Sequence, residues 1–199
     1  MKTSEIGRAD GMTVLFVLIA GGGLGGFIAG QGLISGIFRL IDPTRHPITL
    51  LADIPIEIGP GIVEAHGDWL VVTAEALSVG AVWCFALADL FGAVGVGLAT
   101  GAFGYLLARI IPRKPFHRSA VSAAILAGCA TIFGSALSQS LRGFGQMMAA
   151  TELGPSLGEL PQPAFLFEPL PIVVGFGILA LAYVFQAGIR LQRDTEGFV

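Results

Sequence analysis

Asp89 is the ionisable side chain best placed to do chemistry, because it lies within a long apolar run. An acid held at membrane depth is a candidate functional group, since its charged form is costly there. Three alternatives follow, in order of preference: hydration near the outer membrane boundary, an intramembrane ion pair with Arg39 or Arg142, and a proton relay. The relay comes last because no second intramembrane acid or histidine supplies a path.

A glycine-rich segment matches the sequence motif of a second kind of site, one that binds a dinucleotide. Residues 13–20 followed by Gly21–Gly26 match a strand leading into GxGxxG, and Asp42 lies where a ribose-binding acid would be sought. A dinucleotide fold also needs a second strand that ends at this acid. Asp42 instead follows residues 36–41, which show no strand boundary, and it precedes a proline. The match therefore does not predict a cofactor.

The same glycines satisfy the small-xxx-small pattern of packed membrane helices. Lipid provides no hydrophobic force between helices, so close backbone approach over glycine supplies the attraction. Two alternatives remain open: the glycines pack one helix bundle internally, or they form a face for a separate partner protein. The expected helix-packing residues are Gly21, Gly22, Gly25, Gly26, Gly30, Gly32, Gly36, Gly97 and Gly101.

The remaining reactive residue types do not form a recognisable catalytic or metal site. His46 and His66 lie near several acids, but no HxH or HExxH spacing supports a metal site, and solvated loop residues are the preferred interpretation. Cys84 and Cys129 lie in apolar runs without a CxxC partner. We therefore expect no catalytic residue, no metal, no cofactor and no enzymatic activity.

Four apolar runs must position these side chains, at about 12–41, 78–111, 119–141 and 170–189. Each is long enough to cross a bilayer, which takes about 20 residues. A hydrophobic fraction of 54% and a charged fraction of 13% exclude an ordinary soluble domain. The sequence predicts an all-α membrane protein, with residues 1–199 forming a single integral membrane domain.

The positions of the cations predict how the runs are oriented. Loops with many Lys and Arg residues stay in the cytoplasm, whereas the loops after the first and third runs are rich in acids. We expect a multi-pass protein of the bacterial plasma membrane with both termini in the cytoplasm. The cations assigned to the inner side are Lys2, Arg8, Arg109, Arg113, Lys114, Arg118, Arg190 and Arg193.

Two outer segments connect these helices, at about 42–77 and 142–169. In the first, the isoleucines of 54–58 alternate with other residues and the turn residues Gly59–Gly61 follow. Residues 62–63 and 69–72 are further strand candidates, so the pattern predicts a small β-hairpin or a three-stranded element. Pro55 would confine its strand to an edge, and Trp69 suits a membrane-interface anchor. In the second, Gly143 and Gly145 follow the predicted end of the third helix, and closely spaced prolines favour extended backbone.

Two motifs resemble those of a known family. Lys114-Pro115-Phe116 forms an inner loop that leads into the third helix, and the tail from Phe185 has the form Phe-x-x-Gly…Leu…Asp-x-Glu-Gly. Both resemble the bacterial four-helix membrane family catalogued as domain of unknown function 2975. The resemblance implies the same four-helix plan and a sensory or regulatory role beside a small helix-turn-helix regulator. It implies no catalytic residue, and it does not extend to the glycine-rich first helix or the proline-rich outer loop.

Together these observations predict a non-enzymatic accessory or scaffolding subunit of a larger membrane protein complex. The expected partners are the lipid bilayer and other membrane proteins, with no direct contact to nucleic acid. The alternative is a small membrane sensor that works with a cytoplasmic helix-turn-helix regulator through the Pro115-Phe116 loop. A transporter component is the third alternative. It is ranked last because four helices with one doubtful acid make a poor transport pathway.

Overall fold

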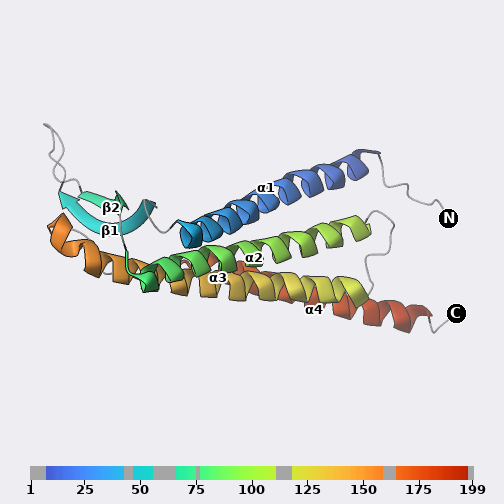
Figure 1. Cartoon of the computed structure of the whole chain (residues 1–199). Coiled ribbons are helices and arrows are strands. Elements are labelled where there is room, and N and C mark those ends of the chain that lie inside the picture. The colour runs from blue at the N-terminus through green and yellow to red at the C-terminus, as the bar shows by residue number, and fades with distance from the viewer. Residues whose placement is uncertain are drawn as a thin grey trace, which may run out of the picture. The chain divides into compact units, whose positions relative to one another are not determined.

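The computed structural model describes residues 8–42, 47–55, 66–74, 77–110, 118–158 and 165–196. In chain order these residues form α1 (Arg8–Ile41), β1 (Pro47–Pro55), β2 (His66–Thr73), α2 (Val79–Ile110), α3 (Arg118–Leu153), the 3-10 helix η1 (Gly154–Leu157) and α4 (Leu170–Glu196) (Figure 1). They divide into two compact units. The first draws on residues 1–31, 92–136 and 169–199, and the second on residues 32–91 and 137–168.

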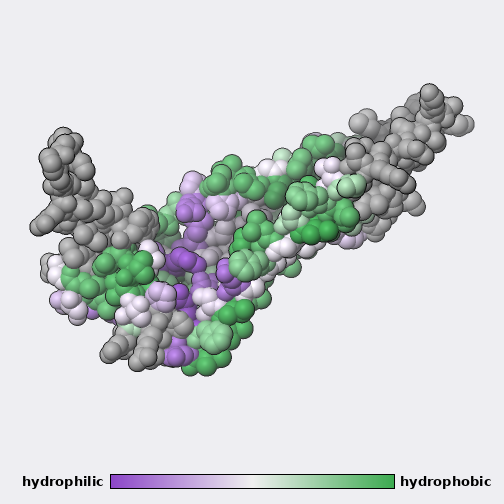
Figure 2. Space-filling view, turned by 90° about the horizontal axis from the view of Figure 1, so that it is seen from above, coloured by the Kyte–Doolittle hydropathy of each residue, from purple (hydrophilic) through white to green (hydrophobic). Residues whose placement is uncertain are grey.

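Four described helices are long and apolar enough to cross a membrane. The candidate spans are Met12–Ile41, Val79–Ala108, Ser119–Leu157 and Leu170–Arg190. Large apolar side chains such as Phe16, Ile34 and Phe176 are exposed on these helices, and Figure 2 shows hydrophobic surface over much of the described chain. The prediction of a mostly helical protein with four candidate spans is confirmed, and it indicates a multi-pass membrane protein.

In the first unit, the helices approach one another closely at glycines. A Cβ atom on Gly95 of α2 would lie 2.9 Å from the Cα atom of Gly134 on α3. A Cβ atom on Gly128 of α3 would lie 3.0 Å from the carbonyl oxygen of Gly175 on α4. No larger residue fits at these points without moving the backbone, so glycine permits the helix contacts that hold this unit together.

In the second unit, a small antiparallel sheet packs against the C-terminal part of α3 (Figure 1). β1 and β2 pair from Pro47↔Thr73 to Pro55↔His66, with a bulge between Leu51 and Ile54. Ile48 and Leu50 alternate with exposed Thr49 and are almost fully buried. They share a core with Phe85 of α2 and with Ala149 and Ala150 of α3. The period-two pattern of a strand therefore gives this sheet its buried face.

The end of α3 also holds the beginning of α2. The backbone N–H of Ser78 donates to the Glu152 carboxylate at 2.8 Å, and the Ser78 hydroxyl accepts a hydrogen bond from the N–H of Ala81 at 3.3 Å. The first turn of a helix has N–H groups without helical partners, and it attracts negative charge. Ser78 and Glu152 supply both an acceptor and a charge at this position.

The predicted end of the third helix near Leu141 is wrong, because α3 continues to Leu153. Helix α3 and η1 therefore occupy residues 142–157 of the predicted second outer segment. Gly143 and Gly145 do not stop the helix. Both are buried, Gly143 against the ring of Phe165 and Gly145 against Cys84 and Phe85. Their small size admits neighbouring side chains, whereas a helix-ending glycine is needed for its positive φ.

The predicted hairpin between α1 and α2 is present as a two-stranded sheet, but its first strand begins earlier than expected. β1 starts at Pro47 rather than near Ile54, and Pro55 ends it. The alternating pattern was visible at Ile48 and Leu50 as well, where the sequence prediction did not apply it. The expected turn at Gly59–Gly61 and the strand candidates within 56–63 lie outside the described residues.

Candidate functional site

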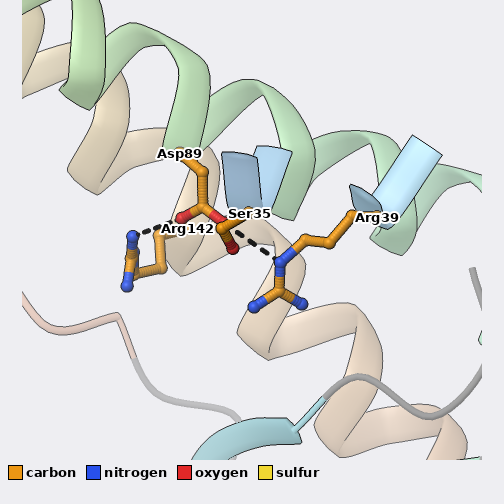
Figure 3. Close-up of polar contacts among 4 residues, drawn as sticks. All are labelled: Ser35, Arg39, Asp89 and Arg142. Carbon is orange, nitrogen blue, oxygen red and sulfur yellow. Dashed lines mark hydrogen bonds and ion pairs between the residues drawn. The ribbon is translucent and has the colours of Figure 1, made fainter. Parts of the chain in front are cut away.

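Asp89 lies at the centre of a polar cluster that joins three helices (Figure 3). Its Oδ2 atom accepts hydrogen bonds from the Ser35 hydroxyl at 2.8 Å and from Arg39 Nε at 3.0 Å, both from α1. Its Oδ1 atom accepts one from Nη2 of Arg142 on α3 at 2.7 Å. We call these four residues the Asp89 cluster. Both carboxylate oxygens are therefore occupied by donors from other helices.

Local helix geometry brings the α1 residues to the carboxylate. Ser35 and Arg39 are four residues apart, so they lie on the same face of α1, one turn above the other. Between them, Gly36 brings α1 close to α2: a Cβ atom there would lie 2.9 Å from the carbonyl oxygen of Ala86. The spacing of α1 and α2 at the cluster thus depends on a residue without a side chain.

Phe85 lies beside the same arginine. It precedes Asp89 by four residues on α2, and the Arg39 guanidinium carbon lies 5.5 Å from the centre of its ring. A cation over an aromatic face is attracted to the ring electrons, by about 0.5–2 kcal/mol depending on exposure. Arg39 therefore contacts both a carboxylate and an aromatic ring of α2.

Burial separates the two arginines. The Asp89 and Arg39 side chains are 11% and 17% exposed, whereas the Arg142 side chain is 53% exposed. The Arg39–Asp89 pair is the partly buried one, in which charge attraction is less screened, and Arg142 closes the cluster from its exposed side. This geometry favours the ion-pair alternative for Asp89 over simple hydration. It suits a clamp between helices better than a proton relay, because both carboxylate oxygens already accept from positive groups.

The expected packing glycines fall into two groups. Gly25 is packed against Thr100, Gly36 against Leu90, and a Cβ on Gly97 would lie 3.7 Å from the Cβ of Ala29. Gly32 is half-buried. The other group has open space around the Cβ position within the described structure; it consists of Gly21, Gly22, Gly26, Gly30 and Gly101. Internal packing therefore accounts for some of these glycines and not for others.

The other residues singled out from the sequence bear less on the site. Trp69 lies in β2 opposite Leu51, but its side chain is outside the described part of the chain, as are the whole of Pro115 and Phe116. Among the described residues, Cys84 and Cys129 are free and half-buried. The described residues include no group of three or more His, Cys, Asp or Glu side chains that could hold a metal.

Sequence reasoning missed several residues that shape the site. Ser35 could have been found from its four-residue spacing to Arg39. Gln139 gave no such indication, yet its side-chain amide donates to the Glu168 carbonyl at 3.1 Å and accepts from the Glu168 N–H at 2.6 Å. This pair fixes residues 165–169 to α3 next to Arg142, and Phe165 completes the contact against Phe144, with ring centres 6.1 Å apart.

Comparison with known proteins returned no relative: the chain matches no protein-family model, no curated protein and no solved structure.

Proposed function

We propose that this chain is a non-enzymatic accessory or scaffolding subunit of a larger membrane protein complex. It would dock through Gly22, Gly26 and Gly30 of α1, here named the open glycine face, against a transmembrane helix of its partner. These glycines are four residues apart and lie on one side of the helix. The observation that carries the proposal is the open space around all three Cβ positions within the described structure.

A glycine that is exposed to lipid adds no favourable side-chain contact with the acyl chains. A side chain such as Leu meets acyl chains favourably, whereas a helical glycine adds no contact and costs about 1 kcal/mol relative to Ala in water. A concentration of glycine on one helix does benefit a second helix that must approach closely. The span of α1 is also less buried within the chain than those of α2 and α3. These features support a partner helix on this face.

Packing within the first unit supports the same proposal. Gly25 of α1 packs against Thr100 of α2, and Ala29 of α1 lies beside Gly97 of α2. A helix held by such contacts keeps its orientation within that unit, so its open glycine face is prepared for a partner before binding. Less conformational freedom then remains to be lost on association.

The test replaces one open glycine and one packed glycine with the same residue. Gly26→Leu should leave the abundance of the protein in the membrane unchanged but abolish stoichiometric recovery of a membrane partner in mild detergent. Gly25→Leu should lower the abundance itself, because its side chain would overlap Thr100. Ile28→Leu, an exposed position on another side of α1, is the control and should change neither quantity. Full partner recovery with Gly26→Leu would contradict docking through this face.

A further inference from the structure

The Asp89 cluster carries an excess of positive charge. Arg39 and Arg142 contribute two positive charges and Asp89 one negative charge, which leaves a formal charge of +1. A guanidinium has five N–H donors. The hydrogen bonds to Asp89 engage only Nε of Arg39 and Nη2 of Arg142. In Figure 3 the terminal nitrogens of Arg39 point away from the carboxylate, so the hydrogen bond to Asp89 does not use them.

The position of the cluster along the helices identifies the environment of these nitrogens. The chain contains no charged residue in 12–38, 90–108, 119–141 or 170–189. At 1.5 Å per residue, the distance from Asp89 to Ala108 along α2 is about 28 Å, close to the roughly 30 Å thickness of a hydrocarbon core. The cluster thus lies at one end of the uncharged stretch, where a membrane presents phosphate groups.

We propose that Arg39 and Arg142 bind an anionic phosphate group, with Asp89 holding the two guanidinium groups in place. The planar fork of arginine matches phosphate oxygens, and its hydrogen bonds to an anion are stronger than those between neutral groups. A phosphodiester carries a single negative charge and would neutralise the cluster. The same chemistry occurs in a phospholipid headgroup and in free phosphate. This binding does not depend on the docking proposed above.

The experiment measures binding to the purified full chain in a neutral maltoside detergent by native mass spectrometry. The probes are dioleoyl phosphatidylglycerol, dioleoyl phosphatidylcholine and inorganic phosphate. Arg142→Gln should weaken phosphatidylglycerol binding about tenfold, which corresponds to the loss of one hydrogen bond to a charged group. Arg190→Gln removes an exposed arginine from the last part of α4 and is the control, with binding expected to remain within about twofold of wild type.

Asp89→Asn separates an anion site from an ion pair that only stabilises the fold. Removal of the negative charge raises the cluster to a formal charge of +2, so phosphatidylglycerol should bind more tightly although the protein becomes less stable. Unchanged or weaker binding in this variant, or wild-type binding in Arg142→Gln, would overturn the proposal. If Asp89→Asn does not accumulate, Arg142→Lys takes its place. It retains the charge without the fork and should bind between wild type and Arg142→Gln.

The probes also identify the source of the phosphate. Tighter binding of phosphatidylglycerol than of phosphatidylcholine, without displacement by millimolar inorganic phosphate, would support a lipid headgroup. Displacement by inorganic phosphate would support the same site with a soluble ligand. Absence of binding by all three probes would overturn it.

Discussion

Arg39 and Arg142 share one carboxylate but lie in different surroundings. Arg39 is mostly covered and stacked on Phe85, whereas Arg142 is more than half exposed. Water screens an exposed pair and provides other partners when it is broken. The two ion pairs should therefore contribute unequally to stability, although their distances differ by only a few tenths of an ångström.

Arg39→Gln should destabilise the protein more than Arg142→Gln does. The first substitution leaves a partly buried carboxylate without its less exposed cation, at a cost of about 1–3 kcal/mol. The second removes a half-exposed pair and should cost less than about 1 kcal/mol. Thermal unfolding midpoints in one detergent would give the order. Equal midpoints, or a lower one for Arg142→Gln, would show that exposure does not set the strength of these pairs.

Sequence reasoning reached the three charged members of the Asp89 cluster but not Ser35, and it could not choose how the charges pair. Asp89, Arg39 and Arg142 stand out as charges at the ends or within apolar runs. Their pairing joins residues about fifty positions apart, and no local pattern fixes such a contact. The contact between Phe85 and Arg39 could not be predicted for a different reason. An aromatic residue in an apolar run gives no sign in the sequence that its ring lies beside a cation.

Glycine has different effects at different points of the same helix. On α2, a Cβ at Gly95 would meet the backbone of α3, whereas a Cβ at Gly104 would meet no atom within 4 Å in the described structure. The first position requires glycine for packing. The second has no such requirement, so only its effect on the helix itself remains.

Substitution with alanine should therefore have opposite effects at these two positions. Gly95→Ala should lower stability by about 1–3 kcal/mol, because α2 and α3 must move apart to accept the methyl group. Gly104→Ala should be neutral or stabilising by up to about 1 kcal/mol, because alanine favours a helix. Thermal unfolding of the two variants beside wild type provides the measurement. A stabilising Gly95→Ala would contradict the close approach of α2 and α3.

The helices were predicted better than their ends. The length of the apolar runs was enough to locate all four helices, because a run of this length is typical of a membrane-spanning helix. The end of α3 was missed because the uncharged run stops at Leu141, and Arg142, Gly143 and Gly145 follow it. The contacts of the two glycines, with Phe165 and Phe85, involve residues far away in the sequence. A glycine that stops a helix and one that packs it are indistinguishable without the neighbouring element.

At the scale of the whole molecule, the cation asymmetry still predicts both termini and the loop before α3 on the cytoplasmic side. The Asp89 cluster is consistent with this prediction. Arg39 lies near the C-terminal end of α1 and Arg142 directly follows the uncharged run 119–141 of α3, and both are paired with an acid. Paired arginines weigh less against the positive-inside rule than free ones do.

Cysteine labelling in intact cells would test this topology. The background should be Cys84→Ala with Cys129→Ala, because alanine keeps the Cβ atom of Cys84 beside Gly145. Ser156→Cys, at an exposed position of η1, should react with a membrane-impermeant thiol reagent added outside. His117→Cys should react only after permeabilisation. Labelling of His117→Cys from outside would refute the predicted orientation.

The resemblance to the four-helix family and the sensor function that it implies both stay predictions. Of the residues that carry the resemblance, Lys114, Pro115 and Phe116 lie outside the described part of the chain, whereas residues 185–196 of the tail lie in α4. Helix formation in this tail is compatible with either function and does not choose between them.

The most direct measurement is the mass of the intact assembly extracted from the membrane in mild detergent, by native mass spectrometry. An accessory subunit predicts a stoichiometric complex in which this 20.6 kDa chain accompanies a larger membrane protein. The Gly26→Leu variant should then appear without that protein. A mass equal to one copy or to a whole number of copies of this chain, or a complex with a DNA-binding protein in place of a membrane protein, would contradict the proposed function.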